Sequence, residues 1–170
     1  ITMKNFKSLF VALMLFLGAT SFVNAQSKIA HIDTQALLTS MPEMKTAQGQ
    51  LEKLQKTYDV EIKTLMKEFE TKLKQWEVEA ETKTDEENAK RGQEAQGMQN
   101  NIAAYREQAI KDLRQKEVDV FNPIRDKAQT AIQKVARTQG YQYVLDSSSG
   151  TTILAEGKDL LVDVKKELGI

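Results

Sequence analysis

Residues 47–80 read AQGQLEKLQKTYDVEIKTLMKEFETKLKQWEVEA, and the spacing of their apolar side chains decides the fold. Steps of four, three and four residues, repeated three times, connect Ala47, Leu51, Leu54, Tyr58, Ile62, Leu65, Phe69, Leu73, Trp76 and Ala80. Eleven residues in three turns is about 3.67 residues per turn, so the stripe stays on one face of a nearly straight helix. Oppositely charged pairs at i, i+4, such as Glu52/Lys56, cover the other faces. This stretch therefore predicts a long amphipathic helix.

Two capping signals mark where this helix begins and where the next one begins. The residues Ser40-Met41-Pro42-Glu43 have a capping-box arrangement, with proline in the first turn, where its missing N–H does no harm. The stripe stops at Ala80, and Thr84-Asp85-Glu86-Glu87 forms a second capping box. We therefore expect the chain to turn near residues 81–85 and to begin a second helix.

The second helix repeats the three- and four-residue spacing at Ala95, Met98, Ile102, Tyr105, Ala109, Leu113, Val120, Ile124, Ala128, Ile132 and Val135. Gly92 and Gly97 lower helix propensity by about 1 kcal/mol each relative to alanine, which predicts a mobile tip. Pro123 predicts a bend or a break, with Asn122 as the cap of a fresh segment. Gly140 predicts the end of the helix.

Together these helices predict a hairpin arm over residues 43–137, about 60 Å long, attached to a small body made from residues 26–42 and 138–170. Residues 28–33 predict a first strand. Residues 141–146 and 151–155 predict two more strands, which a turn at residues 147–150 would join into a hairpin. Asp159 would cap a last helix over residues 160–168, which Gly169 would end. The predicted fold class is mainly α with a small β body.

The predicted body is too small to bury much apolar surface, because three short strands with a long arm attached make a marginal core. Self-association that completes the sheet is the simplest remedy, so we expect a homo-oligomer. The candidate contacts are the apolar residues of the predicted strands: Ile29, Ile32, Tyr141, Tyr143, Leu145 and Ile153.

The first 25 residues predict a secretory signal peptide. A basic start with Lys4 and Lys7 precedes an apolar run over residues 9–17, and small residues before Gln26 place the cleavage after Ala25. The remaining chain holds 22 basic and 24 acidic residues, which gives no electrostatic footprint for nucleic acid. The absence of cysteine excludes disulfides, thiol catalysis and a lipid-modified cysteine. We expect a soluble, exported, periplasmic protein that is not a lipoprotein.

No residue pattern in the sequence points to catalysis. His31 is the only histidine, and no cysteine is present to form a metal site with it. Asp33 and Asp146 end predicted strands and could meet in the sheet, but an aspartate at a strand end is more often a turn residue. The serines at 147–149 lack a nucleophile elbow and a base. We therefore expect no enzymatic activity, no metal and no cofactor.

Five apolar residues fall beside or off the helical stripes, where a solvated helix is normally polar. Scattered surface apolar residues are common, so an ordinary surface is one interpretation. The other is weak, adaptable contact with a partner, for which the thioether of Met66 is best suited. These client-contact candidates are Val60, Met66, Val78, Ile110 and Val118.

Taken in order, these segments resemble the Skp/OmpH family of periplasmic chaperones. The resemblance covers the chain after the signal peptide and is carried by the strand at 28–33 with Thr34-Gln35-Ala36-Leu37-Leu38, Met41-Pro42-Glu43, the charged hairpin, Gly140-Tyr141-Gln142-Tyr143-Val144-Leu145-Asp146 and Asp159-Leu160-Leu161-Val162-Asp163-Val164. It implies a trimer in which strands of three chains form a small barrel and three arms enclose a cavity. In that cavity the family holds unfolded outer-membrane proteins without ATP.

This chain departs from the family in the charge of its arm. The best-known members have strongly basic arms, whereas residues 43–137 hold 18 basic and 18 acidic residues. Net neutrality argues against electrostatic capture of acidic clients and against lipopolysaccharide or membrane-surface binding. We therefore expect client holding to rest on apolar contact and confinement. The alternative function is a structural or scaffolding coiled-coil protein of the envelope that binds a folded partner.

Overall fold

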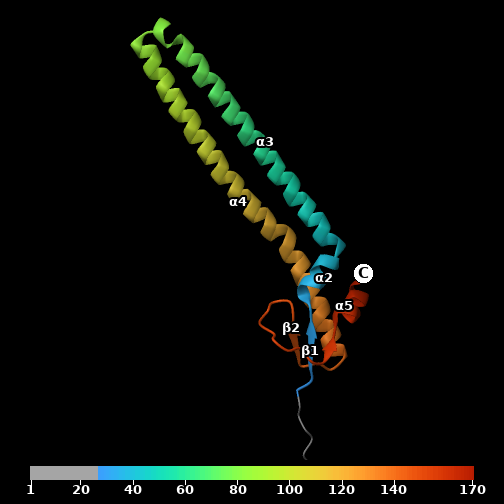
Figure 1. The fold of residues 1–170 in the computed structure, drawn as a ribbon. Helices are drawn as coiled ribbons and strands as arrows, with labels where there is room; N and C mark the ends of the chain where they lie inside the picture. The colour runs from blue at the N-terminus through green and yellow to red at the C-terminus, as the bar shows by residue number, and fades with distance from the viewer. Residues whose placement is uncertain (1–26) are drawn as a thin grey trace, which may run out of the picture.

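The computed structural model describes residues 27–170, which form a long helical arm standing on a small body of strands and helices (Figure 1). The signal peptide expected at residues 1–25 lies outside the described residues. The prediction of a mainly helical fold with a small sheet is confirmed.

The arm is an antiparallel helical hairpin. It consists of α3 (Pro42–Glu79), the 3₁₀ turn η2 (Ala80–Thr82) and α4 (Asp85–Thr138). The turn lies where the sequence predicts it. The second capping box is confirmed, because the Thr84 side chain accepts from the Glu87 N–H while the Glu87 side chain accepts from the Thr84 N–H. With 38 residues, α3 is about 57 Å long.

The predicted stripe on α3 faces α4 along the whole arm. Most of its residues are half-buried, while Leu73 and Ala80 near the tip stay exposed. Between residues 43 and 120, the only buried residues at the interface of the two helices, which we call the seam, are Ala47, Ile102 and Ala109. Two helices share one narrow seam, so the arm holds itself together with little core of its own.

The helix α4 continues through Pro123 without interruption, so the predicted break and the predicted cap at Asn122 are wrong. Proline removes one backbone hydrogen bond and crowds the preceding turn, at a cost of about 3 kcal/mol. Just beyond it, Ile124, Ala128, Ala131 and Val135 are buried against the body. The burial of these four side chains offsets the local cost, and α4 runs into the body without a break (Figure 1).

The sheet contains β1 (Ile29–Ile32), β2 (Tyr143–Asp146) and β3 (Lys158–Asp159) in the order β2-β1-β3, and both pairings are parallel. The predicted hairpin over residues 141–155 is wrong, because residues 151–155 are not a strand. Residues 147–157 form a loop instead, and β2 pairs with β1 rather than with the segment that follows it. Gly157, at φ 131°, then brings the chain against β1, where an added Cβ would lie 3.3 Å from the Ile29 carbonyl oxygen.

A short helix that the sequence analysis missed, α2 (Thr34–Ser40), connects β1 to the arm. The Asp33 carboxylate caps it by accepting from the Ala36 N–H at 2.7 Å. Ser40 therefore ends a helix instead of starting one, and its hydroxyl donates to the Leu37 carbonyl. The capping box predicted at residues 40–43 is wrong, although Pro42 does occupy the first turn of α3.

Both C-terminal helix ends carry the predicted glycine stops. After α4, the Tyr141 N–H donates to Ala136 O and the Gly140 N–H donates to Arg137 O, with Gly140 at φ 74°. This pair of hydrogen bonds forms a Schellman motif, which needs the left-handed conformation that glycine tolerates. The last helix, α5 (Leu161–Leu168), ends in the same way at Gly169. The cap predicted at Asp159 is wrong, because Leu160 is the N-cap residue of α5. Asp159 lies in β3, and its carboxylate accepts from the Leu161 N–H at 2.8 Å.

The core lies between the sheet, α2, the last turns of α4 and α5. Its fully buried side chains are Ile32, Leu37, Met41, Leu160 and Val164. Burying each of them contributes about 1.5–3 kcal/mol relative to exposure. The core gathers residues from both ends of the chain, so the body cannot form until the hairpin has returned the chain to its start.

Candidate functional site

One polar contact between a tyrosine and an aspartate joins the two helices of the arm near its middle. The Tyr58 hydroxyl on α3 donates to the Asp112 carboxylate on α4 at 2.8 Å, and this hydrogen bond raises the pKa of Tyr58. Tyr58 also packs edge to face against Tyr105, with ring centroids 5.9 Å apart. These contacts set the register of the two helices near the middle of the arm.

Ion pairs cross between the helices at three further levels. Glu79 pairs with Arg91 near the tip, Lys72 pairs with Glu94 below it, and Glu43 pairs with Lys127 at the base. A hydrogen bond from Gln75 and then the Arg91 guanidinium lower the pKa of Glu79. Within α3, the predicted ion pair between Glu52 and Lys56 forms at 2.7 Å. Lys72, also on α3, pairs instead with Glu94 on α4. Exposed ion pairs contribute about 0–1 kcal/mol each to the free energy of unfolding. These pairs therefore help to align the two helices but add little stability.

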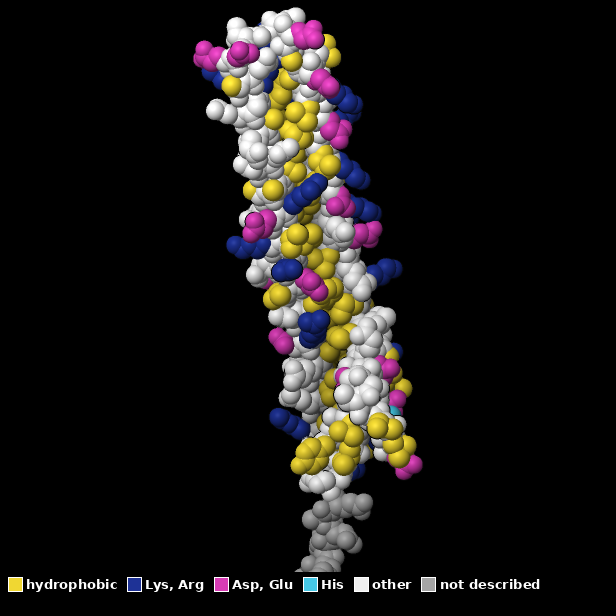
Figure 2. Space-filling model, turned by 60° about the vertical axis from the view of Figure 1, so that its left-hand side comes forward, with side chains coloured by type: hydrophobic (Ala, Val, Ile, Leu, Met, Phe, Trp, Pro, Cys, Tyr) yellow, Lys and Arg dark blue, Asp and Glu magenta, His cyan; other side chains and the backbone are white. Residues whose placement is uncertain are grey.

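All five client-contact candidates are exposed on the arm. Val60 and Val78 lie on the side of α3 away from α4, as their position relative to the stripe requires. Met66 lies at the edge of the seam, where it lines a shallow groove with Phe69, Ile102 and the Arg106 guanidinium. Figure 2 shows apolar side chains following the line between the two helices.

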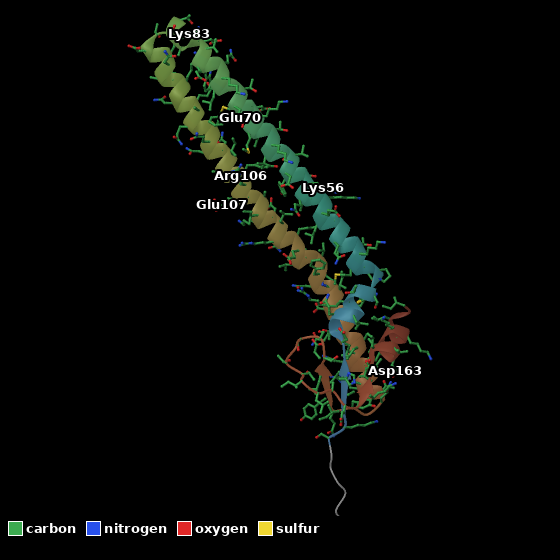
Figure 3. The ribbon with its side chains drawn as sticks, viewed as in Figure 1. Lys56, Glu70, Lys83, Arg106, Glu107 and Asp163 are labelled. Atoms are coloured by element: carbon green, nitrogen blue, oxygen red, sulfur yellow. The ribbon has the colours of Figure 1, made fainter. Side chains whose placement is uncertain are left out.

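Ile110 and Val118 are brought together on α4 with charged neighbours. They are 53% and 50% exposed, and both line a shallow hollow of about 710 Å³ whose residues all come from α4. Glu107, Lys111 and Arg114 line the same hollow. Figure 3 shows Glu107 on the side of α4 that faces away from α3. The hollow therefore lies on the outer face of the arm.

A second exposed apolar surface lies on the body. In the parallel register Ile29 pairs with Tyr143 and His31 pairs with Leu145, and paired residues point to the same side of the sheet. Ile29, Tyr143 and Leu145 are all exposed, Tyr143 by 59%. We call these three residues the outer sheet face. Figure 2 shows apolar side chains gathered on the body.

The other candidates for self-association have different places. Ile32 points inward and belongs to the chain's own core. Tyr141 packs partly against that core, and the Lys28 ammonium lies 4.3 Å from its ring centroid. Ile153 is 99% exposed in the loop between β2 and β3. Within residues 27–170, β2 pairs only with β1, so its other edge has open backbone groups.

The acidic residues considered for catalysis both have structural roles. Asp33 caps α2. Asp146, at the end of β2, accepts from the Thr34 hydroxyl at 2.8 Å and from the Ser148 N–H at 2.9 Å. Burial would raise the pKa of Asp146, but the hydrogen bonds from Ser148 and Thr34 outweigh it and hold the pKa below its usual value. These carboxylates hold the start of α2 and the following loop against the sheet.

His31 points to the same side of the sheet as Leu145, with which it pairs, and its Nδ1 atom is buried without a hydrogen-bond partner among the described residues. Over residues 27–170, no group of three or more His, Cys, Asp or Glu residues is arranged to hold a metal ion. In the same range, no helix combines the length and the apolar character that crossing a bilayer requires.

Sequence reasoning missed the charged part of the α4 hollow. Counting charges over residues 43–137 gives zero, and this sum hides where each charge lies. A helical projection about the seam would have placed Lys111, Arg114 and Val118 together, because they lie opposite Ala109 and Val120.

Three comparisons with known proteins each found a match. The family model described as outer membrane protein (OmpH-like) matches residues 28–168. The Chaperone protein Skp of Pectobacterium atrosepticum is 23% identical over 154 residues, covering 91% of this chain and 93% of the relative. A solved crystal structure from Caulobacter crescentus CB15, described as an OmpH-like outer membrane chaperone, superposes with a TM-score of 0.73 at 15% identity. It covers 86% of this chain and 87% of the other.

Proposed function

Because the chain belongs to the OmpH-like outer membrane protein family, we propose that it is an ATP-independent holdase chaperone of the periplasm. In this proposal it binds unfolded outer-membrane proteins in a cavity between the arms of a homotrimer and prevents their aggregation. The observation that carries the proposal is a long, thinly cored arm with exposed apolar side chains, attached to a body whose outer sheet face is uncovered.

The outer sheet face supports the proposed self-association. Ile29, Tyr143 and Leu145 leave a contiguous apolar surface beside the open edge of β2. Open strand edges with apolar side chains invite pairing with another chain. Three copies that meet through this face would form a small barrel, and each copy would contribute one arm.

The arm supports holding rather than tight binding. Its exposed apolar residues are spread along α3 and α4 instead of forming one deep pocket. Unfolded chains present many short apolar segments, so repeated weak contacts can hold them reversibly without nucleotide. Confinement between three arms raises the effective concentration of these contacts. No catalytic step is part of the proposal.

The proposal is tested by diluting a urea-unfolded outer-membrane β-barrel protein into buffer with the purified protein and no nucleotide. We expect a molar excess of trimer to suppress light scattering from aggregation. If scattering rises at the same rate with and without the protein, the proposal is lost.

Shortening the arm distinguishes a holdase from a scaffold that binds a folded partner through the body. Replacing residues 70–98 by a short turn removes the tip and leaves the seam contact between Tyr58 and Asp112 in place. A holdase loses much of its client protection, because the cavity between the arms is shortened, but it keeps its sedimentation mass. A scaffold with contacts in the body binds its partner as before.

A further inference from the structure

The charges around the hollow on α4 are not neutralised by their neighbours. Within residues 27–170, neither Lys111 nor Arg114 has a carboxylate oxygen within 4.0 Å. The nearby Asp112 carboxylate instead accepts from the Tyr58 hydroxyl and from Gln108. Asp119 accepts from Gln115 at 2.8 Å. Two cations are therefore left on the outer face, with Glu107 as the only acid that lines the hollow.

One of these cations, Arg114, lies between two apolar side chains at a regular interval. Ile110, Arg114 and Val118 follow one another every four residues, which is a rise of about 6 Å per step along the helix. Side chains on one face of an extended strand repeat every two residues, or about 6.6–6.8 Å. A strand-like segment lying along α4 would therefore place its side chains i, i+2 and i+4 opposite these three residues.

We propose that this hollow on the outer face of α4 binds extended segments of unfolded chains that carry an acidic residue flanked by apolar residues. The occupant is a client segment with an apolar, an acidic and an apolar side chain at i, i+2 and i+4. Its carboxylate meets Arg114 and Lys111, and its apolar side chains cover Ile110 and Val118. The inference rests on the proposed function, because it names the client segments that the arm selects.

The charge balance of the hollow favours this occupant over a basic one. Two cations and one carboxylate line it, so a basic segment would meet net repulsion. Exposed charge pairs contribute modestly, and two of them together change an equilibrium constant by about fivefold. The net neutrality of the whole arm is therefore compatible with a local preference for acidic segments.

Site-specific photo-crosslinking of a urea-unfolded outer-membrane β-barrel protein tests the proposal. A benzophenone side chain replaces Gln115, which lines the hollow, or Thr64, which lies on α3 between Lys63 and Lys67. The double variant Lys111→Gln/Arg114→Gln removes both cations from the hollow and keeps good helix formers. The matched control, Lys63→Gln/Lys67→Gln, removes two charges from α3.

We expect the crosslink yield at position 115 to fall about fivefold in Lys111→Gln/Arg114→Gln and to stay unchanged in the control. Client peptides captured at position 115, identified by mass spectrometry, should be enriched in acidic residues with apolar neighbours relative to those captured at position 64. An unchanged yield at position 115, or captured peptides with no such enrichment, overturns the inference.

The same samples separate this inference from the proposed function. Light scattering of the client with the wild-type protein tests holding by itself. If the wild type suppresses aggregation but the crosslink yield at position 115 is the same in Lys111→Gln/Arg114→Gln as in the wild type, only the inference fails. If the wild type gives no protection at all, the proposed function fails.

Discussion

Single side chains show how polar residues at strand ends organise the body. Asp146 receives hydrogen bonds from Thr34 and Ser148, so one carboxylate ties the end of β2 to the start of α2 and to the loop that follows it. Asp33, which follows β1, accepts from the Ala36 N–H in the same way. Both carboxylates thus act as hydrogen-bond acceptors that hold the body together.

Replacing this acceptor predicts a pH-dependent loss of stability. Asp146→Asn should lower the free energy of unfolding at pH 7 by about 1–2 kcal/mol, because several hydrogen bonds to a charged acceptor are weakened. The folded pKa of Asp146 lies below its ordinary value of about 3.8, so its stabilisation is present above that pH and is lost as the pH falls through the folded pKa.

Urea unfolding followed by circular dichroism at pH 7 and near pH 3 measures this effect. The difference between wild type and Asp146→Asn should shrink at the lower pH. Asp126→Asn, an exposed acid on α4, is the control and should change little at either pH. Equal destabilisation at both pH values would contradict the role given to the carboxylate.

At the scale of elements, the arm is a hairpin whose outer half has little to hold it. Gly92 and Gly97 lie inside α4 near the tip, and a Cβ added at either position would meet nothing within 4 Å. No steric reason for glycine exists at these positions in the described structure. They lower helix stability at the part of the arm where the seam is most exposed.

Alanine at these two positions should therefore stiffen the tip. Gly92→Ala and Gly97→Ala should each stabilise the helix by about 1 kcal/mol and slow amide hydrogen exchange around residues 85–100. Gly49→Ala in α3 is a matched control, because it also has open space and should leave exchange at the tip unchanged. Gly140→Ala should destabilise instead, because φ at this residue is 74°. Unchanged exchange at the tip in both variants would refute the assignment of flexibility to these glycines.

At the scale of the whole molecule, one copy leaves one side of its sheet exposed. The inner side of the sheet packs on the core, while Ile29, Tyr143 and Leu145 stay exposed on the outer side. The outer sheet face is therefore the surface on which the proposed trimer depends.

A charge placed on this face should dissociate the assembly. Tyr143→Asp would bury an unpaired carboxylate in the proposed interface, which should weaken association by about 100-fold or more. Sedimentation velocity at micromolar concentration should then give the mass of a monomer, with helix content retained. Val162→Asp, at an exposed apolar residue on α5, should leave the wild-type mass unchanged. A Tyr143→Asp protein with the wild-type mass would show that the copies meet elsewhere.

Much of the arm could be predicted from sequence, because its determinants are local. Helical periodicity, the Thr84–Glu87 capping box and the Gly140 stop each act over a few residues, and the structure contains all three. The candidate contact residues on the arm could also be found this way, since position on a helix relative to the seam decides exposure. The local charge of the α4 hollow needed the same projection, which a sum of charges does not provide.

The body depended on contacts between distant parts of the chain. Residues 151–155 have strand-like composition, but they form part of the loop between β2 and β3, and the strand that pairs with β2 is β1, from a distant part of the chain. Pro123 has a helix-breaking character, yet the burial of Ile124 and Ala128 carries α4 through it. Ile29 and Ile32 lie three residues apart, so a strand places them on opposite faces, and only the packing against the sheet decides that Ile32 is the one in the core. The sequence by itself thus determined the hairpin arm, because hydrogen bonds and side-chain spacing within a helix are local. The tertiary structure decided the sheet, its exposed face and the continuity of α4, because these depend on which distant segments compete for the same neighbours.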